Sequence, residues 1–273
     1  MFRIIACLSA LVCLFSAPAI AAEDNSHPSQ CMAIARSLPD SLRPVTIPAA
    51  FSFGTASASE EVSITYAGHS TYVIETPGGV RIATDFSGIY GTNPLPRIVT
   101  MNKAHSSHFT SAPDPAIEYV LRGWDPSGAP AQHRLVVDDV YIRNVTTDIR
   151  SAGAMEADGN SIFIFEVADL CIGHLGHLHH MLDNSDYAAI GRLDILMVPV
   201  DGGLTLSHKG MAEIVNRLQS SIVLPMHRRF TAVDTFLDNV KGLFEVRYAG
   251  SDTIKVSLRT LPKSPTILIP DGL

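Results

Sequence analysis

Short apolar segments rich in β-branched and aromatic residues recur along the chain from Glu61 onward, and they restrict the fold more than any other feature. The first three are VSITYAG, STYVIET and VRIATDF, with a Pro-Gly-Gly turn at residues 77–79 between the last two. Such segments, separated by turn residues, are typical of strands in a β-meander. A further strand, LPRIVTM, is expected at residues 95–101.

Helix signals follow that strand. Asp114 is a suitable N-cap, Pro115 suits the first helical position, and Gly123 can end a helix. We therefore expect a helix over residues 115–123.

The second half of the chain alternates strands with amphipathic helices. The expected strands and strand pairs lie at residues 134–147, 161–176, 193–203, 221–227, around 244–258 and 266–269, and the expected helices at 207–220 and 232–243. A meander followed by strand-helix-strand units indicates sheets packed face to face with helices outside.

The N-terminus has the pattern of a secretory signal peptide. Arg3 precedes an apolar run over residues 4–15, and Pro18 precedes the small-residue site at 19–21. Cleavage is expected after Ala21 or Ala22, because the run is short of the roughly 20 residues that an uncleaved anchor needs to span a bilayer.

The expected organisation is a signal peptide at 1–22, an N-terminal helix (around 31–37) with a linker at 23–59, and one domain at 60–273. The mature protein is expected to be periplasmic or secreted, without stable membrane association. Signal cleavage leaves Cys31 and Cys171. An oxidising compartment allows these two to pair, but a buried thiol at Cys171 is an equally natural reading.

The charge distribution argues against polyanionic partners. The formal net charge is -7, and the basic residues form no runs. A nucleic-acid or anionic-lipid surface is therefore not expected, and a small molecule is the expected partner.

Eleven histidines are present, and several of them follow predicted strands. His105 and His108 follow one strand, the segment HLGHLHH at 174–180 ends another, and His227 ends a third. Imidazoles that converge from strand ends can bind zinc and leave room for water. A lone histidine is more often a hydrogen-bonded surface or core residue, which is the reading for His27, His133 and His208, and a His-rich tract alone gives many false positives.

The order of TYAGHSTYVIET, RIATDF, the histidine loop, NSIFIFEVADLCIGHLG, DILMVPVDGG and IVLPMH resembles the metallo-β-lactamase fold over about residues 60–230. Within that superfamily it is similar to lactonase-like hydrolases related to ascorbate-6-phosphate lactonase. The resemblance implies an α/β (α+β) fold: a four-layer αββα sandwich of two mixed β-sheets with helices on the outer faces. It also implies a metal site between the sheets.

The histidine loop departs from the family pattern His-x-His-x-Asp-His. Lys103 replaces the first histidine and Ser107 the aspartate, while His105 and His108 are kept. His177 follows Gly176 where the family has an aspartate after glycine.

Two other positions complete the comparison with the family pattern. Where the family has an isolated middle histidine, the chain has Thr147 and Asp148, and His227 matches the final histidine. An imidazole nitrogen binds one metal and cannot bridge two, so one ion is expected rather than two.

The resemblance thus implies a single divalent ion, zinc first, with iron, nickel or copper as alternatives. Its expected ligands are His105, His108, His177 and His227, with Asp148 as a further ligand or a supporting partner.

Roles in catalysis are assigned to three more residues. Lys103 is expected to stand in for the lost cation by stabilising substrate charge, with a solvated surface lysine as the alternative. Asp85 is expected near the active edge, more as an organiser of loops than as a catalyst. His69 is a candidate for moving a proton to the leaving group, alongside His179 and His180, or a residue that only orients a turn.

The expected function is an exported, single-metal hydrolase that attacks an ester, lactone or amide through a metal-bound hydroxide. The alternative is a non-catalytic periplasmic protein of the same fold that binds a metal or a small ligand, which the loss of the loop aspartate favours. The fold alone does not decide between them.

Overall fold

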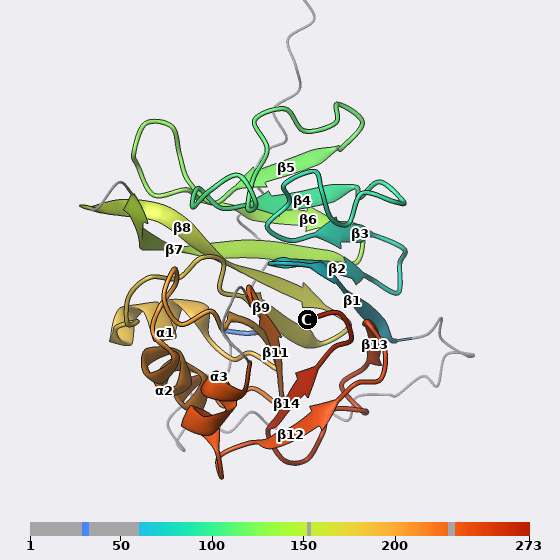
Figure 1. The fold of residues 1–273 in the computed structure, drawn as a ribbon. Coiled ribbons are helices and arrows are strands. Elements are labelled where there is room, and N and C mark those ends of the chain that lie inside the picture. The colour runs from blue at the N-terminus through green and yellow to red at the C-terminus, as the bar shows by residue number, and fades with distance from the viewer. Residues whose placement is uncertain (1–28, 33–59, 152–153, 229–232) are drawn as a thin grey trace, which may run out of the picture.

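The computed structural model describes residues 29–32, 60–151, 154–228 and 233–273 (Figure 1). The predicted signal peptide and nearly all of the predicted N-terminal helix and linker lie outside the described residues. Within the described part of the chain, no helix has the length and apolar character needed to cross a membrane.

A six-stranded mixed sheet forms one half of the molecule (Figure 1). Its first three strands in the chain pair antiparallel, as the meander pattern predicts, and the next two add in parallel. In spatial order the strands are β13 (Thr253–Val256), β1 (Val62–Gly68), β2 (Thr71–Glu75), β3 (Arg81–Ala83), β4 (Ile98–Met101) and β5 (Tyr119–Arg122).

An eight-stranded mixed sheet forms the other half. Parallel pairing over five strands gives way to antiparallel pairing over the last three. In spatial order the strands are β12 (Glu245–Tyr248), β14 (Thr266–Ile269), β11 (Ile222–Met226), β10 (Ile195–Pro199), β9 (Leu170–His174), β8 (Ala154–Val167), β7 (Val140–Ser151) and β6 (Arg134–Val137).

The two sheets pack face to face over a buried apolar core. Phe163 and Phe165 of β8 lie in this core together with Ile64 of β1. Ile162 and Ile164 lie in a separate cluster on the opposite face of the same strand. Successive side chains of a strand point to opposite faces, so β8 is apolar on both sides and is buried on both.

The three described helices cover the outer face of the eight-stranded sheet. Ile190, Ile214 and Phe236, one from each helix, belong to the same apolar cluster as Ile162 and Ile164. The helices are α1 (Asn184–Ile190), α2 (His208–Leu218) and α3 (Val233–Val240). The predicted sandwich of two mixed sheets is therefore confirmed, and α2 and α3 lie where the sequence predicts helices.

The predicted helix over 115–123 is wrong. Residues 119–122 form β5, which pairs in parallel with β4. The capping signal at Asp114 is real but local: its carboxylate accepts a hydrogen bond from the Ala116 N–H at 2.9 Å, and its carbonyl accepts one from the Ile117 N–H at 3.0 Å. Sheet pairing decides the conformation of the residues that follow.

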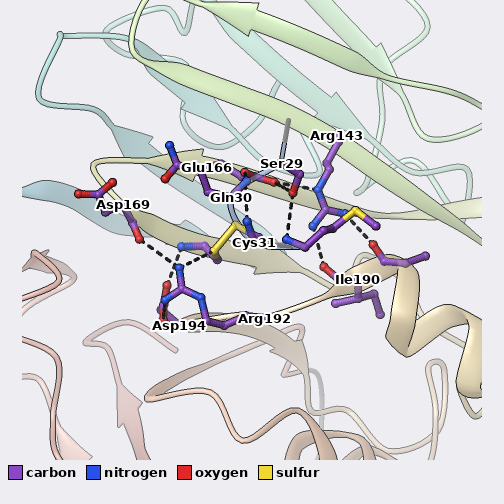
Figure 2. Close-up of a disulfide and its surroundings, with 12 residues drawn as sticks. Ser29, Gln30, Cys31, Arg143, Glu166, Asp169, Ile190, Arg192 and Asp194 are labelled. Atoms are coloured by element: carbon purple, nitrogen blue, oxygen red, sulfur yellow. Dashed lines mark hydrogen bonds and ion pairs between the residues drawn. A yellow bond between two sulfur atoms is a disulfide. The ribbon is translucent and has the colours of Figure 1, made fainter. Parts of the chain in front are cut away.

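A short N-terminal segment, Ser29–Met32, is tied to the eight-stranded sheet (Figure 2). A disulfide joins Cys31 to Cys171 of β9, with 5.9 Å between the Cα atoms. The Glu166 carboxylate accepts hydrogen bonds from Ser29 Oγ at 2.5 Å and from the Gln30 N–H at 2.8 Å. We call residues 29–32 the strap.

A buried ion pair between Arg143 and Glu166 holds the carboxylate that binds the strap. Arg143 Nε donates to Glu166 at 2.9 Å, and the other two guanidinium nitrogens donate to the carbonyls of Ala189 and Ile190 at 2.8 and 2.7 Å. The strap, β7, β8 and the end of α1 are thus held by one network. Of the two readings of Cys171, the structure shows the disulfide.

Candidate metal centre

Five histidines from four connections meet at one edge of the sandwich. His69 lies on the turn between β1 and β2, and His105 and His108 lie on the loop after β4. His177 follows β9 and His227 follows β11, two strands of the parallel part of the second sheet. Parallel strands end at the same edge, which brings residues distant in sequence together. We call these five residues the histidine cluster.

The imidazole rings of the cluster are close to one another. Ring centroids are 4.5 Å apart for His105 and His108, and 4.4 Å for His69 and His227. One nitrogen from each of these four rings can be chosen so that all four lie within 4.8 Å of one another. His177 contacts three of the rings, with centroids 5.0 Å from His105, 4.6 Å from His108 and 4.8 Å from His227.

Two of the rings are braced from behind by carboxylates. His108 Nδ1 lies 2.7 Å from Asp85 Oδ2, and His227 Nδ1 lies 3.0 Å from Asp201 Oδ1. Since a carboxylate accepts, each Nδ1 carries the proton, and each Nε2 keeps a free lone pair. A carboxylate behind Nδ1 is the usual support of a metal-binding histidine.

Ser107 braces the other two rings. Its hydroxyl lies 2.8 Å from His69 Nε2 and 2.7 Å from His105 Nδ1. A hydroxyl oxygen has two lone pairs and can accept a hydrogen bond from each ring, which leaves the other nitrogen of each ring in its neutral form with a lone pair. The residue that takes the place of the family's loop aspartate therefore positions two imidazoles.

Burial fixes the charge states at this edge. Burial, together with the neighbouring histidines, lowers the pKa of His69 to about 3 and the pKa of His177 further still. Burial alone would raise the pKa of Asp85 and Asp201. Hydrogen bonds and attraction from the histidines nevertheless hold both below the ordinary value. His69 and His177 are therefore neutral at pH 7, while Asp85 and Asp201 are ionised.

The backbone at the cluster is strained. His69, Asp85 and His227 have φ values of 53°, 42° and 55°, in the left-handed region that side chains other than glycine seldom adopt. The His227 N–H donates to the His69 carbonyl at 2.7 Å, which links the turn of the first sheet to a strand end of the second. Backbone strain of this kind collects at functional sites.

The cluster fits a divalent cation. The Nε2 atoms of His108, His177 and His227 are buried and have no hydrogen-bond partner among the described residues. Unpaired buried polar atoms are costly, and a metal ion would satisfy lone pairs such as those of His108 and His227. His69 and His105 are only half-buried, which leaves the site open to solvent on their side.

The structure places the predicted site residues as follows. His105, His108, His177 and His227 are brought together, as predicted, and His69 joins them as a possible ligand rather than only as a proton carrier. Asp85 is fully buried and organises the loop, as expected, through His108 and through Asn102, whose Nδ2 donates to it at 2.8 Å.

Two predicted residues make other contacts. Asp148 is not in the group of mutually close donor atoms, and its carboxylate accepts a hydrogen bond from the Asp158 N–H at 3.2 Å. The Lys103 ammonium group is ion-paired with Glu156 of β8, and the side chain is 41% exposed. Its charge is thus already balanced by a carboxylate outside the cluster, so the predicted catalytic role has no contact to support it.

Sequence reasoning missed Asp201 and Ser107 as braces of the histidines. Asp201 comes two residues after the end of β10, which pairs with β11, the strand that precedes His227. A signal was available, because a carboxylate at the end of one parallel strand lies near the residue at the end of the next. Ser107 gave no such signal, since the sequence shows it only as the replacement of the family's loop aspartate.

Comparison with known proteins agrees with this geometry. The family model of the beta-lactamase superfamily domain matches residues 63–227. A metal-dependent hydrolase of Salinibacter ruber is 21% identical over 225 residues, which covers 70% of this chain and 95% of that protein.

Two solved structures have a similar fold. A candidate Zn-dependent hydrolase of the metallo-β-lactamase superfamily from Thermotoga maritima has a TM-score of 0.54 and 25% identity, covering 77% of this chain and 98% of its own. A candidate metal-dependent hydrolase from Parabacteroides distasonis has a TM-score of 0.53 and 17% identity, covering 66% and 89%. The fold and the histidine edge define a metallo-β-lactamase-like protein. The chain belongs to the metallo-β-lactamase superfamily.

Proposed function

We propose that the protein is an exported metal-dependent hydrolase that holds one divalent ion in the histidine cluster and cleaves an ester, lactone or amide bond. One observation carries the proposal: four imidazoles, two of them braced by buried carboxylates, present nitrogen atoms to a common point. The relatives from Salinibacter ruber and Thermotoga maritima, both described as metal-dependent hydrolases, support it.

His105, His108 and His227 would hold the ion, with His69 as a fourth ligand. A bound ion of this type supplies a Lewis acid that polarises a carbonyl group and makes water more acidic. Imidazole ligands suit zinc, iron, nickel and copper alike. Zinc is the first candidate because the similar Thermotoga maritima structure is described as a Zn-dependent hydrolase.

Ser107 favours one ion over two. A carboxylate can bridge two cations through its two oxygens, whereas this hydroxyl is neutral and lies between His69 and His105. The two buried carboxylates behind His108 and His227 balance the charge of one divalent ion.

The chain's own residues orient two of the imidazoles and leave one side of the site open. Asp85 and Asp201 hold two imidazoles in the tautomer that leaves Nε2 free. Half-buried His69 and His105 face the open side, where a substrate can approach, while His108 and His227 close the inner side. An open position is what separates a catalytic site from a structural one.

Metal analysis of protein purified without a histidine tag tests the proposal. About one ion for each chain, with turnover in a panel of lactones, esters and amides, is the expected result. A stable ion with no turnover across the panel would support the alternative, a non-catalytic binding protein, which the absence of a carboxylate at Ser107 favours. Protein that binds no ion when zinc is added would overturn both.

Export is proposed on separate grounds. The basic, apolar and small-residue regions of residues 1–22 support it, and so does the disulfide between Cys31 and Cys171, because disulfides persist in oxidising compartments. Cell fractionation, N-terminal sequencing and thiol titration would test it. A cytoplasmic protein that keeps residues 1–22 and has free thiols at Cys31 and Cys171 would contradict it.

A further inference from the structure

We propose that His177 is not a ligand of the ion but a hydrogen-bond donor, which presents an Nε2–H group to the oxygen of a bound ligand. The use of this group in hydrolysis rests on the proposed function, but the hydrogen bonds that define it do not. They belong to His177, His179 and the segments that contact them.

The tautomer of His179 is fixed by two backbone groups. The Arg150 N–H donates to His179 Nδ1 at 2.8 Å, so Nδ1 carries no proton. His179 Nε2 lies 2.7 Å from the Leu204 carbonyl, which can only accept, so Nε2 carries the proton. Burial lowers the pKa of His179 to about 4, which leaves the ring neutral with a single N–H at pH 7.

The tautomer of His177 follows from that of His179. His177 Nδ1 lies 3.0 Å from His179 Nε2, which already holds a proton and has no lone pair in that direction. Nδ1 of His177 must therefore accept, in a hydrogen bond that His179 shares between it and Leu204. A neutral imidazole has only one proton, so that of His177 lies on Nε2.

His177 thereby differs in the position of its proton from two neighbouring histidines, His108 and His227. His108 and His227 donate hydrogen bonds from Nδ1–H to Asp85 and Asp201, which leaves Nε2 of each neutral ring with a lone pair. His177 has an imidazole, not a carboxylate, behind Nδ1, and offers a proton. Its Nε2 atom is buried without a partner among the described residues. The ring centroids of His177 and His108 are 4.6 Å apart.

The backbone holds this donor in place. The His177 N–H donates to Asn160 Oδ1 at 2.8 Å. Gly176 has a φ of 62°, and a Cβ atom there would lie 2.4 Å from side-chain atoms of Asn102 and Asn160, so only glycine allows the chain to turn at this point.

The ligand class follows from the pairing of donor and ion. A carbonyl or carboxylate oxygen beside the ion could accept the His177 N–H while the lone pairs of the other rings bind the metal. A fixed donor of this kind stabilises negative charge that develops on a carbonyl oxygen. A lactone, ester or amide carbonyl fits, and a ligand without an oxygen acceptor would leave the N–H unpaired.

The first test is spectroscopic and uses metal-free protein. Long-range proton–nitrogen NMR separates the two neutral tautomers, and the His177 signals are identified by their loss in His177→Gln. We expect the Nε2–H tautomer for His177 and the Nδ1–H tautomer for His108 and His227. The Nδ1–H tautomer at His177 would overturn the proposal. His179→Phe should shift the His177 population toward Nδ1–H, which a purely structural role would not do.

The second test compares zinc affinity. His177→Phe should bind zinc within about threefold of the unsubstituted protein, whereas His227→Phe should bind at least 100-fold more weakly, as expected for loss of a ligand. Equal losses in the two variants would make His177 a ligand and overturn the proposal.

Turnover measurements distinguish the hydrogen-bond donor of His177 from the packing of its ring. His177→Phe should lower kcat by about 100-fold, the typical cost of one lost oxyanion donor. His177→Gln, whose amide can donate, should recover part of it. If the unsubstituted protein binds no zinc, the proposed function fails, while the tautomer measurement still decides the role of His177.

Discussion

The strap and the histidine cluster both bury polar groups against the eight-stranded sheet, but they satisfy them differently. In the network that holds the strap, the Glu166 carboxylate and all three nitrogens of the Arg143 guanidinium have protein partners. Arg192, which pairs with Asp194 outside this network, has an Nε atom without a partner among the described residues. At the cluster, three ring nitrogens lack a partner within the described part of the chain.

The difference separates a structural network from a binding site. A fully paired network has nothing left to bind, and its effect is on folding stability. Unpaired atoms that converge from three connections carry an energetic cost that a ligand can remove. Substitutions in the network that holds the strap should therefore change folding stability and leave metal affinity unchanged. Substitutions of the carboxylates that brace the histidine cluster should lower metal affinity and have little effect on stability.

The largest effect is expected from Arg143→Met. Removing one partner of a buried ion pair should lower the free energy of unfolding by about 3–5 kcal/mol, because the Glu166 charge stays buried. Urea unfolding at pH 7 measures it. Arg247→Met, which breaks an exposed pair with Glu245, is the matched control, and should cost less than about 1 kcal/mol. Equal losses in the two variants would remove the contrast.

Asp85→Asn should lower metal affinity rather than folding stability. Loss of the charged brace behind His108 should weaken zinc binding by about 10- to 100-fold. Equilibrium zinc titration measures the change. Asp138→Asn is a control on the protein surface, since its carboxylate pairs with Arg97, and should leave the affinity unaltered. Unchanged affinity in Asp85→Asn would show that the brace does not support a ligand.

The metal-free protein should lose stability as the pH falls. The pKa of His69 is lowered from 6.5 to about 3 and that of His179 to about 4, so below pH 6.5 the unfolded chain binds protons that the folded protein does not. Each such proton is worth at most about 1.4 kcal/mol per pH unit, less where solvent reaches the ring.

Unfolding free energies at pH 7, 6 and 5 measure this dependence. They should fall steadily toward pH 5, and His69→Gln should flatten the slope because one of the titrating groups is gone. Stability that stays level or rises toward acid would show that these imidazoles are not held neutral.

The smallest effect is expected from Lys103→Met. Because its ammonium group is paired with Glu156 and partly exposed, turnover should stay within about twofold. Steady-state kinetics with an active substrate measures it. A tenfold or larger fall in kcat with unchanged zinc affinity would instead support the predicted stabilisation of substrate charge.

The strands and the meeting of the histidines could be predicted from sequence, because β-branched runs and strand-end positions carry local signals. Residues 119–122 could not, since pairing with β4 overrides the helix signal at Asp114. The helix α1 was missed although Asp183 and Asp186 form a capping box. Its seven residues are too few for a clear period.

The details of the site depend on contacts that no local pattern contains. His69 comes to the cluster through its hydrogen bond with the His227 backbone, 158 positions further along the chain. The proton position on His177 depends on Arg150 and Leu204 through His179. Such contacts exist only once both sheets are assembled, so sequence spacing could not reveal them.

Zinc binding to metal-free, untagged protein tests the central claim most directly when it is measured beside the double variant His108→Ala/His227→Ala and the variant Arg143→Met. We predict about one zinc ion for each chain in the unsubstituted protein and in Arg143→Met, and none in the double variant. Zinc bound equally by the double variant, or by none of the three, would contradict the assignment of the histidine cluster as a metal site.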